Sequence, residues 1–298
     1  MTHTEPASMT SLSLRAGLLS GLILLLLLAV WHVATLPAPT VAAPVQNLTP
    51  EQIEYLKLQG KDPTTAAADK PSSGFPTLGQ MADTVAHHLS DPFYDNGPND
   101  KGIGLQLAYS LMRVGLGFGI AVLVAIPLGF VLGMSPLVYK ALYPYINVLK
   151  PISPLAWMPL ALYTIKDSSV SGVFVIFICS VWPMLINTAF GVAAVRRDWI
   201  NVARTLEVGP LRKSFEVILP AAAPTILTGM RISIGIAWLV IVAAEMLVGG
   251  TGIGYFIWNE WNNLSLTNVI FAILVIGVVG MVLDWMFGRL QKAVSYVE

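Results

Sequence analysis

The sequence has 298 residues, of which 55% are hydrophobic and 11% are charged, whereas a soluble domain carries about 25% charged residues. The 17 basic and 17 acidic residues balance, so no overall charge attracts nucleic acid, and the single cysteine excludes an intrachain disulfide and a cysteine-rich metal site. This composition predicts a membrane protein.

Five apolar stretches are long enough to cross a bilayer, whose hydrocarbon core needs about 20 residues of helix. They cover residues 16–36, 107–133, 170–194, 223–248 and 268–288. Arg15 before the first stretch and small residues after it would also suit a cleaved signal peptide, but the full spanning length favours a retained helix. Each of the other stretches is predicted to be one transmembrane helix.

A sixth candidate span lies between Val138 and Ile165 and contains four prolines: Pro144, Pro151, Pro154 and Pro159. A proline inside a helix removes a backbone hydrogen bond and clashes with the preceding turn, so we expect this span to be kinked or broken. Membranes tolerate such a break only against protein or a water-lined cavity. The predicted fold class is an all-α integral membrane protein with six transmembrane helices.

The distribution of basic residues predicts the orientation. With residues 1–15 in the cytoplasm, six spans place nine of them on the inner side: Arg15, Lys140, Arg196, Arg197, Arg204, Arg212, Lys213, Arg289 and Lys292. The short outer loops carry only Lys166. The positive-inside rule therefore favours cytoplasmic N- and C-termini.

The segment from residue 37 to 104 is then a long extracytoplasmic insertion. Capping boxes at residues 49–52 and 77–80 predict two short helices within it. His87 and His88 in the second helix point about 100° apart, so we expect a solvated pair rather than metal ligands. We expect these helices to cover the mouth of the spans or a soluble partner.

A polar segment, NVARTLEVGPLRKSFEVILPAA at residues 201–222, interrupts the apolar pattern on the predicted cytoplasmic side. Asp198 is expected to cap a helix that begins at Trp199, and Gly209-Pro210 to end it. A second short helix, LRKSFEVIL, is expected to lead to a bend at Pro220. The segment is either a solvated connector or a rigid amphipathic lever that inserts into a groove of another protein.

One face of the predicted lever helix is apolar and consists of Trp199, Val202, Ala203 and Leu206. Ala203, Val217, Leu219 and Pro220 also stand at the spacing of the EAA signature. From about Leu105 to the C-terminus the chain resembles the permease subunits of ABC importers in the nitrate/sulfonate/taurine family. The segments NVARTLEVGP and WNEWNNLSLTN are similar to those of the nitrate and bicarbonate importers of that family.

The signature departs from the family pattern at two places. Asn201 and Val202 replace the usual Glu-Ala pair, and Glu207 stands where the general motif has glycine. Since Gly209 follows two positions later, we expect the elbow after the helix to bend later than in relatives.

The resemblance implies an organisation into a cytoplasmic N-terminus (1–15), a first span (16–36), the extracytoplasmic insertion (37–104) and a permease core with five spans (105–298). It also implies a homodimer with a second permease copy, two ABC ATPase subunits and an extracytoplasmic substrate-binding protein in a bacterial inner membrane. The residues expected to contact an ATPase are Asp198, Trp199, Asn201, Val202, Ala203, Arg204, Leu206, Glu207 and Gly209.

Nucleotide chemistry is expected to belong to the partners. The chain has no G-x-x-x-x-G-K-[ST] phosphate loop, so ATP and Mg²⁺ would be bound by the ATPase subunits, and the chain itself needs no cofactor and is not an enzyme. The glycine-rich stretch at residues 250–254 follows a span rather than a strand, so we expect a packed turn or a flexible gate instead of a nucleotide loop.

Five charged residues fall within or near the apolar spans, namely Arg113, Lys150, Arg231, Glu245 and Asp284. An ionised group there is costly and normally faces a partner or a water-filled cavity. Lys150, Arg113, Arg231 and Glu245 are candidates for a substrate pathway, and Lys150 beside Pro151 is the most specific of them. The alternative is that the cations pair with Glu245 and Asp284. Glu245 looks like the family's acidic position at the outer end of the fifth span, and we expect it to fix a gate by bonding to neighbouring backbone N–H groups.

The favoured function is translocation of nitrate, with nitrite as a companion substrate, by an ATP-driven importer. Bicarbonate is the nearest alternative substrate. A proton-coupled secondary transporter that uses Glu245 or Asp284 is a second alternative, although no inverted repeat is evident. A membrane enzyme is disfavoured because the spans contain no metal-ligand or nucleophile-base cluster.

Overall fold

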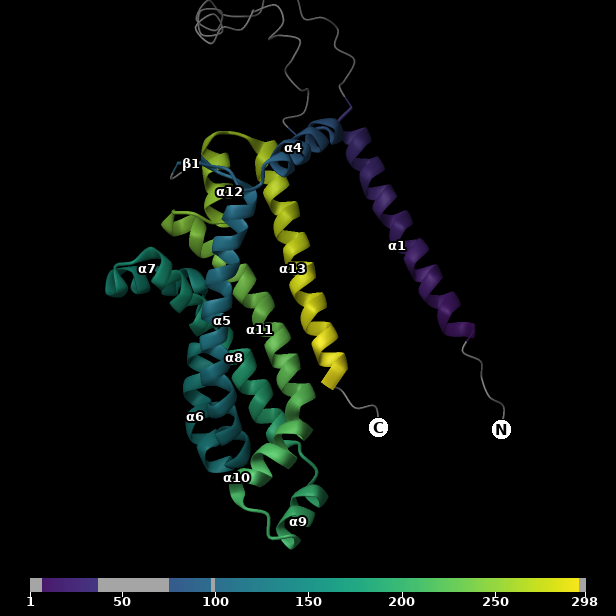
Figure 1. Cartoon of the computed structure of the whole chain (residues 1–298). Helices are drawn as coiled ribbons and strands as arrows, with labels where there is room; N and C mark the ends of the chain where they lie inside the picture. Colours follow the sequence, from purple (N-terminus) through teal and green to yellow (C-terminus); the bar gives the residue numbers. More distant parts are fainter. Residues whose placement is uncertain (1–6, 37–74, 98–99, 295–298) are drawn as a thin grey trace, which may run out of the picture. The chain divides into compact units, whose positions relative to one another are not determined.

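The computed structural model describes residues 7–36, 75–97 and 100–294 (Figure 1). The chain divides into two compact units, residues 1–87 and residues 88–298. The helix predicted from the first capping box lies outside the described residues.

The first unit contains α1 (Ala7–Ala34) and most of α4 (Leu78–Ser90). No side chain in the apolar part of α1, residues 14–34, is buried, so the helix needs lipid or another chain around it. The Trp31 indole N–H donates to the carbonyl oxygen of Pro76 at 2.9 Å, which ties the end of α1 to the segment before α4. The capping box is confirmed, because Thr77 N–H donates to Gln80 Oε1 at 2.9 Å and Gln80 N–H donates to Thr77 Oγ1 at 3.3 Å.

The second unit opens with a short antiparallel pair, β1 (Asp95–Gly97) and β2 (Asp100–Lys101), which the sequence did not predict. Lys101 forms an ion pair with Asp95 across this pair, and its hydrogen bond lowers the pKa of the Asp95 carboxyl below its ordinary value. Every element that the structure describes after this pair is a helix.

The helices that follow are α5 (Ile103–Met134), α6 (Pro136–Leu149), α7 (Pro154–Ile165), α8 (Ser168–Ala193), α9 (Arg197–Thr205), α10 (Pro210–Lys213), the π-helical turn η2 (Ser214–Ile218), α11 (Leu219–Val248), α12 (Ile253–Asn262) and α13 (Leu266–Val294). The all-α fold class is confirmed. Among the described residues, five helices are long and apolar enough to cross a membrane, and the α6–α7 segment is not one of them.

The bundle is built around α8, which packs against α5 on one side and α11 on the other. Glycines allow this close approach. A Cβ atom at Gly117 would lie 2.7 Å from the Ile176 side chain, and one at Gly129 would lie 2.6 Å from Thr188. Because lipid is as apolar as leucine, membrane helices associate through such close packing of small residues rather than through the hydrophobic effect.

The proline-rich candidate span is broken, as predicted. α6 ends at Leu149 and α7 begins at Pro154, with Ser153 capping α7 by accepting from the Leu155 N–H. The two pieces have 14 and 12 residues, each shorter than the roughly 20 that a bilayer requires.

The second helix of the polar segment is not a separate element. α10, η2 and α11 form one continuous helix of 39 residues from Pro210 to Val248, so Pro220 lies inside a helix rather than between two. The bend expected at Pro220 stays a prediction, because a continuous helix can still bend at a proline or a π-helical turn. Pro220 is the second residue after the π-helical turn. A proline lacks an N–H and crowds the carbonyl four residues earlier, and the wider turn accommodates this without ending the helix.

Candidate functional site

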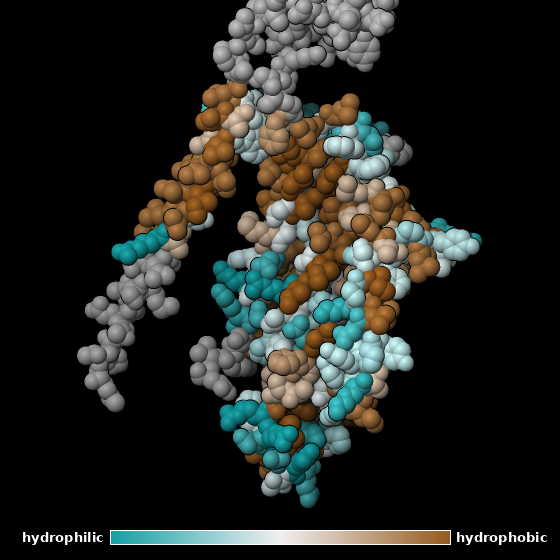
Figure 2. Space-filling view, turned by 180° about the vertical axis from the view of Figure 1, so that it is seen from behind, coloured by the Kyte–Doolittle hydropathy of each residue, from teal (hydrophilic) through white to brown (hydrophobic). Residues whose placement is uncertain are grey.

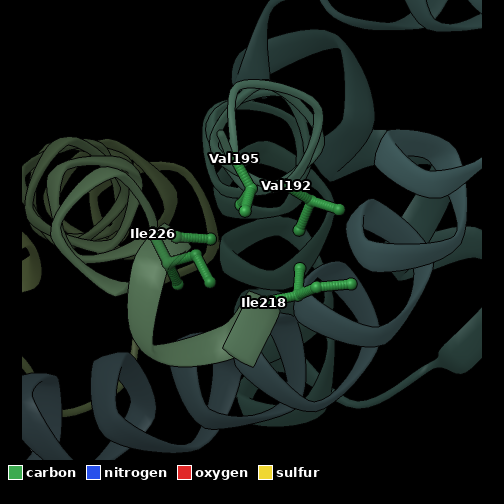
Figure 3. Packing of buried hydrophobic residues seen from close by; sticks show 5 residues of the cluster. Val192, Val195, Ile218 and Ile226 are labelled. Atoms are coloured by element: carbon green, nitrogen blue, oxygen red, sulfur yellow. The ribbon is translucent and has the colours of Figure 1, made fainter. Parts of the chain in front are cut away.

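The first candidate site is the α9 segment at one end of the bundle. A cluster of buried apolar residues joins the end of α8 and the turn after it to η2 and the start of α11: Val192, Val195, Ile218, Ala222 and Ile226 (Figure 3). Ile200 of α9 packs against this cluster, and Ala203 is buried. α9 is therefore held to the bundle through its inner face.

The outer face of α9 is apolar and exposed. Val202 is 58% exposed and Leu206 is 70% exposed, and Trp199 lies on the same side. Leu211 and Phe215 on the following helix are also exposed. We refer to these five exposed apolar residues together as the coupling surface, after the role that the sequence predicts for this segment. Figure 2 shows apolar side chains among the hydrophilic ones that gather at this end of the bundle.

The structure corrects two expectations about α9. The helix begins at Arg197, two residues before the predicted start, and Asp198 lies in its first turn instead of capping it. The predicted apolar face also divides, because Ala203 faces inward while Trp199, Val202 and Leu206 face outward. All other candidate contact residues are exposed: Asp198, Trp199, Asn201, Val202, Arg204, Leu206, Glu207 and Gly209.

The elbow after α9 bends at Glu207, not later. The Val208 N–H donates to the Ala203 carbonyl and the Glu207 N–H to the Arg204 carbonyl, both at 3.0 Å, which is the Schellman pattern of helix termination. Glu207 takes the left-handed position of this motif with φ of 50°. The residue that replaces the family's glycine therefore adopts the backbone conformation that glycine favours.

Replacing Glu207 with glycine is expected to stabilise the elbow by about 1 kcal/mol, because a side chain in the left-handed region costs roughly 1–2 kcal/mol and glycine avoids that cost. Thermal unfolding of the purified wild-type and variant proteins would measure the change. Gly209→Ala is the matched control, since Gly209 has φ of −59° and nothing lies within 4 Å of a Cβ atom there. A loss of stability in Glu207→Gly would contradict the expectation.

The second candidate site is a buried polar cluster where α5, α8 and α11 meet at the other end of the bundle. The Arg113 Nη1 donates to Glu245 Oε1 at 2.7 Å and to the Thr251 carbonyl at 2.6 Å, while its Nε donates to Ser169 Oγ at 3.0 Å. Arg113 is 9% exposed and Glu245 is 4% exposed. The ion pair joins α5 to α11, and the bond to Thr251 fixes the loop after α11 onto α5.

The same cluster binds the start of α12. The first N–H groups of a helix have no partner within it. Here three consecutive N–H groups donate to side chains: Gly252 to Gln106 Oε1 at 2.7 Å, Ile253 to Ser110 Oγ at 2.9 Å and Gly254 to Glu245 Oε2 at 3.0 Å. Glu245 therefore accepts from a backbone N–H group, as the family resemblance suggested.

The glycine-rich stretch at residues 250–254 forms a packed turn around Glu245. A Cβ atom at Gly252 would lie 2.2 Å from the carboxyl carbon of Glu245, so no other residue fits there without displacing the carboxylate. Gly250 adopts a φ of 94°, which side chains rarely tolerate. Both glycines are thus required by the geometry of the turn.

A second ion pair joins α11 to α13. The Arg231 guanidinium donates from Nε and Nη2 to both oxygens of Asp284, each at 2.6 Å. Four of the five intramembrane charges therefore form two ion pairs. No carboxylate oxygen in the described part of the chain lies within 4.0 Å of the Lys150 amine, which leaves Lys150 as the unpaired charge of the five.

The structure corrects the expectation that His87 and His88 are both solvated. His88 is buried, its Nε2 lies 3.2 Å from Asn268 Oδ1, and its ring stacks on Phe271 at 4.8 Å between ring centres. Its helical spacing from Met81 was the signal in the sequence, because positions i and i+7 share a helix face. No group of three potential metal ligands occurs among the described residues.

Comparison with known proteins identifies the family. Residues 125–296, more than half of the chain, match the model of the binding-protein-dependent transport system inner membrane component. The chain belongs to this family of ABC transporter permeases. It is therefore a multi-pass membrane protein and a transport component.

This permease is similar to proteins that import nitrate and bicarbonate, and two of them serve as examples. It is 44% identical to the nitrate import permease protein of Synechocystis sp. over 226 residues, which are 76% of this chain and 82% of that protein. It is also 44% identical to the bicarbonate transport system permease protein of Synechocystis sp. over 208 residues, 70% of this chain and 74% of that protein.

Solved structures support the fold of the permease. A chain of the inward-facing MetNI methionine ABC transporter superposes with a TM-score of 0.57 at 13% identity and covers 63% of this chain and 94% of that one. At this identity the similarity concerns the fold alone.

Proposed function

We propose that this permease is the translocation subunit of an ATP-driven importer for small inorganic anions, with nitrate as the main substrate and nitrite as a companion. The observation that carries the proposal is the 44% identity to a nitrate import permease over 82% of that protein's length. Lys150, the unpaired cation at the break between α6 and α7, suits an anionic substrate.

Bicarbonate is the second candidate substrate. The bicarbonate transport system permease is as similar as the nitrate permease over a somewhat shorter stretch. Both substrates carry one negative charge and are small, so a pathway built for one would not strongly reject the other. We propose that selection between them rests largely on the extracytoplasmic binding protein that delivers the anion.

In the proposed assembly, two copies of the permease form the pathway and two ATPase subunits bind at the α9 end, which is cytoplasmic. The coupling surface supports this placement, because a short rigid helix with an exposed apolar face is suited to a groove on another protein. The α6–α7 segment counts as the sixth span, and both termini lie in the cytoplasm of a bacterial cell.

A proton-coupled transporter is less well supported. Glu245 is buried against Arg113, and Asp284 accepts two hydrogen bonds from Arg231. An acid that carries protons must be free to bind and release them, and each of these carboxylates is already engaged by a guanidinium. Because both acids are engaged in ion pairs, we propose that a separate ATPase, rather than a proton gradient, supplies the energy for transport.

The proposal is tested by isolating the tagged permease with its bound partners from the native membrane and reconstituting the complex with its binding protein. We expect nitrate to stimulate ATP hydrolysis and nitrite to do so as well, with chloride as the inactive control anion. Stimulation by bicarbonate alone, at fixed pH, would select the second candidate. Anion uptake driven by a proton gradient in vesicles that contain only this chain would overturn the proposal.

A further inference from the structure

A cavity beside the break in the proline-rich segment is the strongest unassigned feature of the bundle. It has a volume of about 180 Å³ and is lined by the α6–α7 break, α7, α8 and α11 through Lys150, Ile152, Pro154, Cys179, Trp182, Pro183 and Ile236. A site needs about 10–15 Å³ of such volume for one water molecule, so this cavity has room for a small ion with several waters.

The cavity lies halfway along the membrane-spanning helices. Cys179 and Pro183 are in the middle of α8, and Ile236 is in the middle of α11. Lys150 is exposed on the surface of the chain and contributes to the lining. A lysine at this depth is costly unless water or a counter-charge accompanies it.

Of the cations Arg113, Lys150 and Arg231, which lie in or beside the spans, only Lys150 lacks an acidic partner among the described residues. Arg113 is neutralised by Glu245, and Arg231 is neutralised by Asp284. Lys150 has no carboxylate within ion-pair distance in the chain as far as the structure describes it. The middle of the bundle therefore carries one net positive charge next to a cavity.

We propose that the Lys150 cavity is a transit site for a small monovalent anion on its way through the permease. This inference rests on the proposed function and names the residue that attracts the substrate within the membrane. A single ammonium is suited to this role, because a site for transport must bind well enough to admit the ion and weakly enough to release it. Lysine is also a point charge that does not demand one anion geometry.

Because the chain has only one cysteine, a single substitution removes every native thiol from it. Cys179→Ala provides a cysteine-free background, in which Lys150→Cys places one reactive thiol at the cavity. Aminoethyl methanethiosulfonate then attaches a positive group through a disulfide with loss of methanesulfinate, and sulfonatoethyl methanethiosulfonate attaches a negative group of similar size. Nitrate uptake is measured in cells that hold the complete importer.

We expect Lys150→Cys to lower nitrate uptake about tenfold or more, because the attraction of a unit charge at this depth is lost. The positive reagent is expected to restore most of the uptake, whereas the negative reagent restores none. Nitrate should slow the reaction of the thiol if the anion occupies the cavity. Equal uptake before and after either reagent, or restoration by both, would overturn the inference.

Two controls separate the possible failures. Lys166→Met removes the same charge at the exposed far end of α7, and we expect its uptake to match that of the cysteine-free parent. Copurification of the ATPase with Lys150→Cys shows that the variant still assembles. If the parent itself carries neither nitrate nor bicarbonate, the proposed function fails; if the parent transports and Lys150→Cys transports equally, only the transit site fails.

Discussion

Replacing Arg113 with methionine is expected to destabilise the bundle by about 3–5 kcal/mol, because Glu245 would remain buried without its cation. Arg113 also donates to the Thr251 carbonyl and to Ser169, so those acceptors would lose their donor in the same variant. Thermal unfolding of the detergent-purified protein would measure the loss. We expect the loop after α11 to become accessible to protease at the same time.

The matched control is Arg231→Met, which also breaks an arginine–carboxylate pair. The side chains of Arg231 and Asp284 are 40% and 57% exposed, whereas those of Arg113 and Glu245 are 11% and 4% exposed. We therefore expect a smaller loss of stability from Arg231→Met. The double variant Arg113→Met with Glu245→Gln should lose less stability than the sum of the two single changes, since no buried charge remains. Equal losses for both arginines would show that burial of the pair is not what makes it important.

Replacing Leu206 with aspartate is expected to release or uncouple the ATPase while the spans stay folded. Leu206 is 70% exposed in the chain alone, and surface substitutions usually change stability by no more than about 0.5 kcal/mol. In a groove of the ATPase, however, a buried aspartate would cost about 2 kcal/mol or more, which is roughly a 30-fold loss of affinity. The amount of ATPase that copurifies and the anion-stimulated hydrolysis would measure the effect.

Leu264→Asp is the control for this experiment. Leu264 is 90% exposed at the opposite end of the bundle and has φ of 57°, a conformation that aspartate tolerates better than leucine. We expect it to leave assembly and hydrolysis unchanged. Intact assembly with undiminished hydrolysis in Leu206→Asp would show that the coupling surface is not the ATPase contact.

The arrangement of the spans was predictable because the bilayer imposes it. Residues in lipid must satisfy their backbone groups within a helix, so a long apolar stretch has one solution. The expected span at 107–133 corresponds to α5, and the expected span at 170–194 corresponds to α8. The break before Pro154 was equally predictable, since proline has a local steric effect that does not depend on the rest of the fold.

The contacts of the candidate sites were less predictable, because they join residues far apart in the sequence. Arg113 and Glu245 are separated by 132 positions, and nothing in the local pattern indicates which cation meets which acid. The resemblance suggested the backbone bond of Glu245, but not Ser110 or Gln106, which are ordinary polar residues in an apolar helix.

The polar segment shows how local rules fail when packing competes with them. Ala203 and Val202 are neighbours on the same helix, and only the position of α9 against the ends of α8 and α11 decides which one is buried. Side chains rarely adopt the left-handed backbone, so the pattern favoured Gly209 over Glu207 as the point of bending. The Schellman bonds, together with packing around the helix end, place Glu207 there instead.

The uninterrupted helix from Pro210 to Val248 has a consequence for how this protein can vary in length. At 39 residues it is about 58 Å long, and it carries Phe215 near one end and Glu245 near the other. Inserting a single residue near its centre would rotate one end against the other by about 100° and separate them by a further 1.5 Å or so. Glu245 would then turn away from Arg113 while Phe215 kept its place. We therefore expect insertions and deletions to be tolerated in the loops but not within this helix.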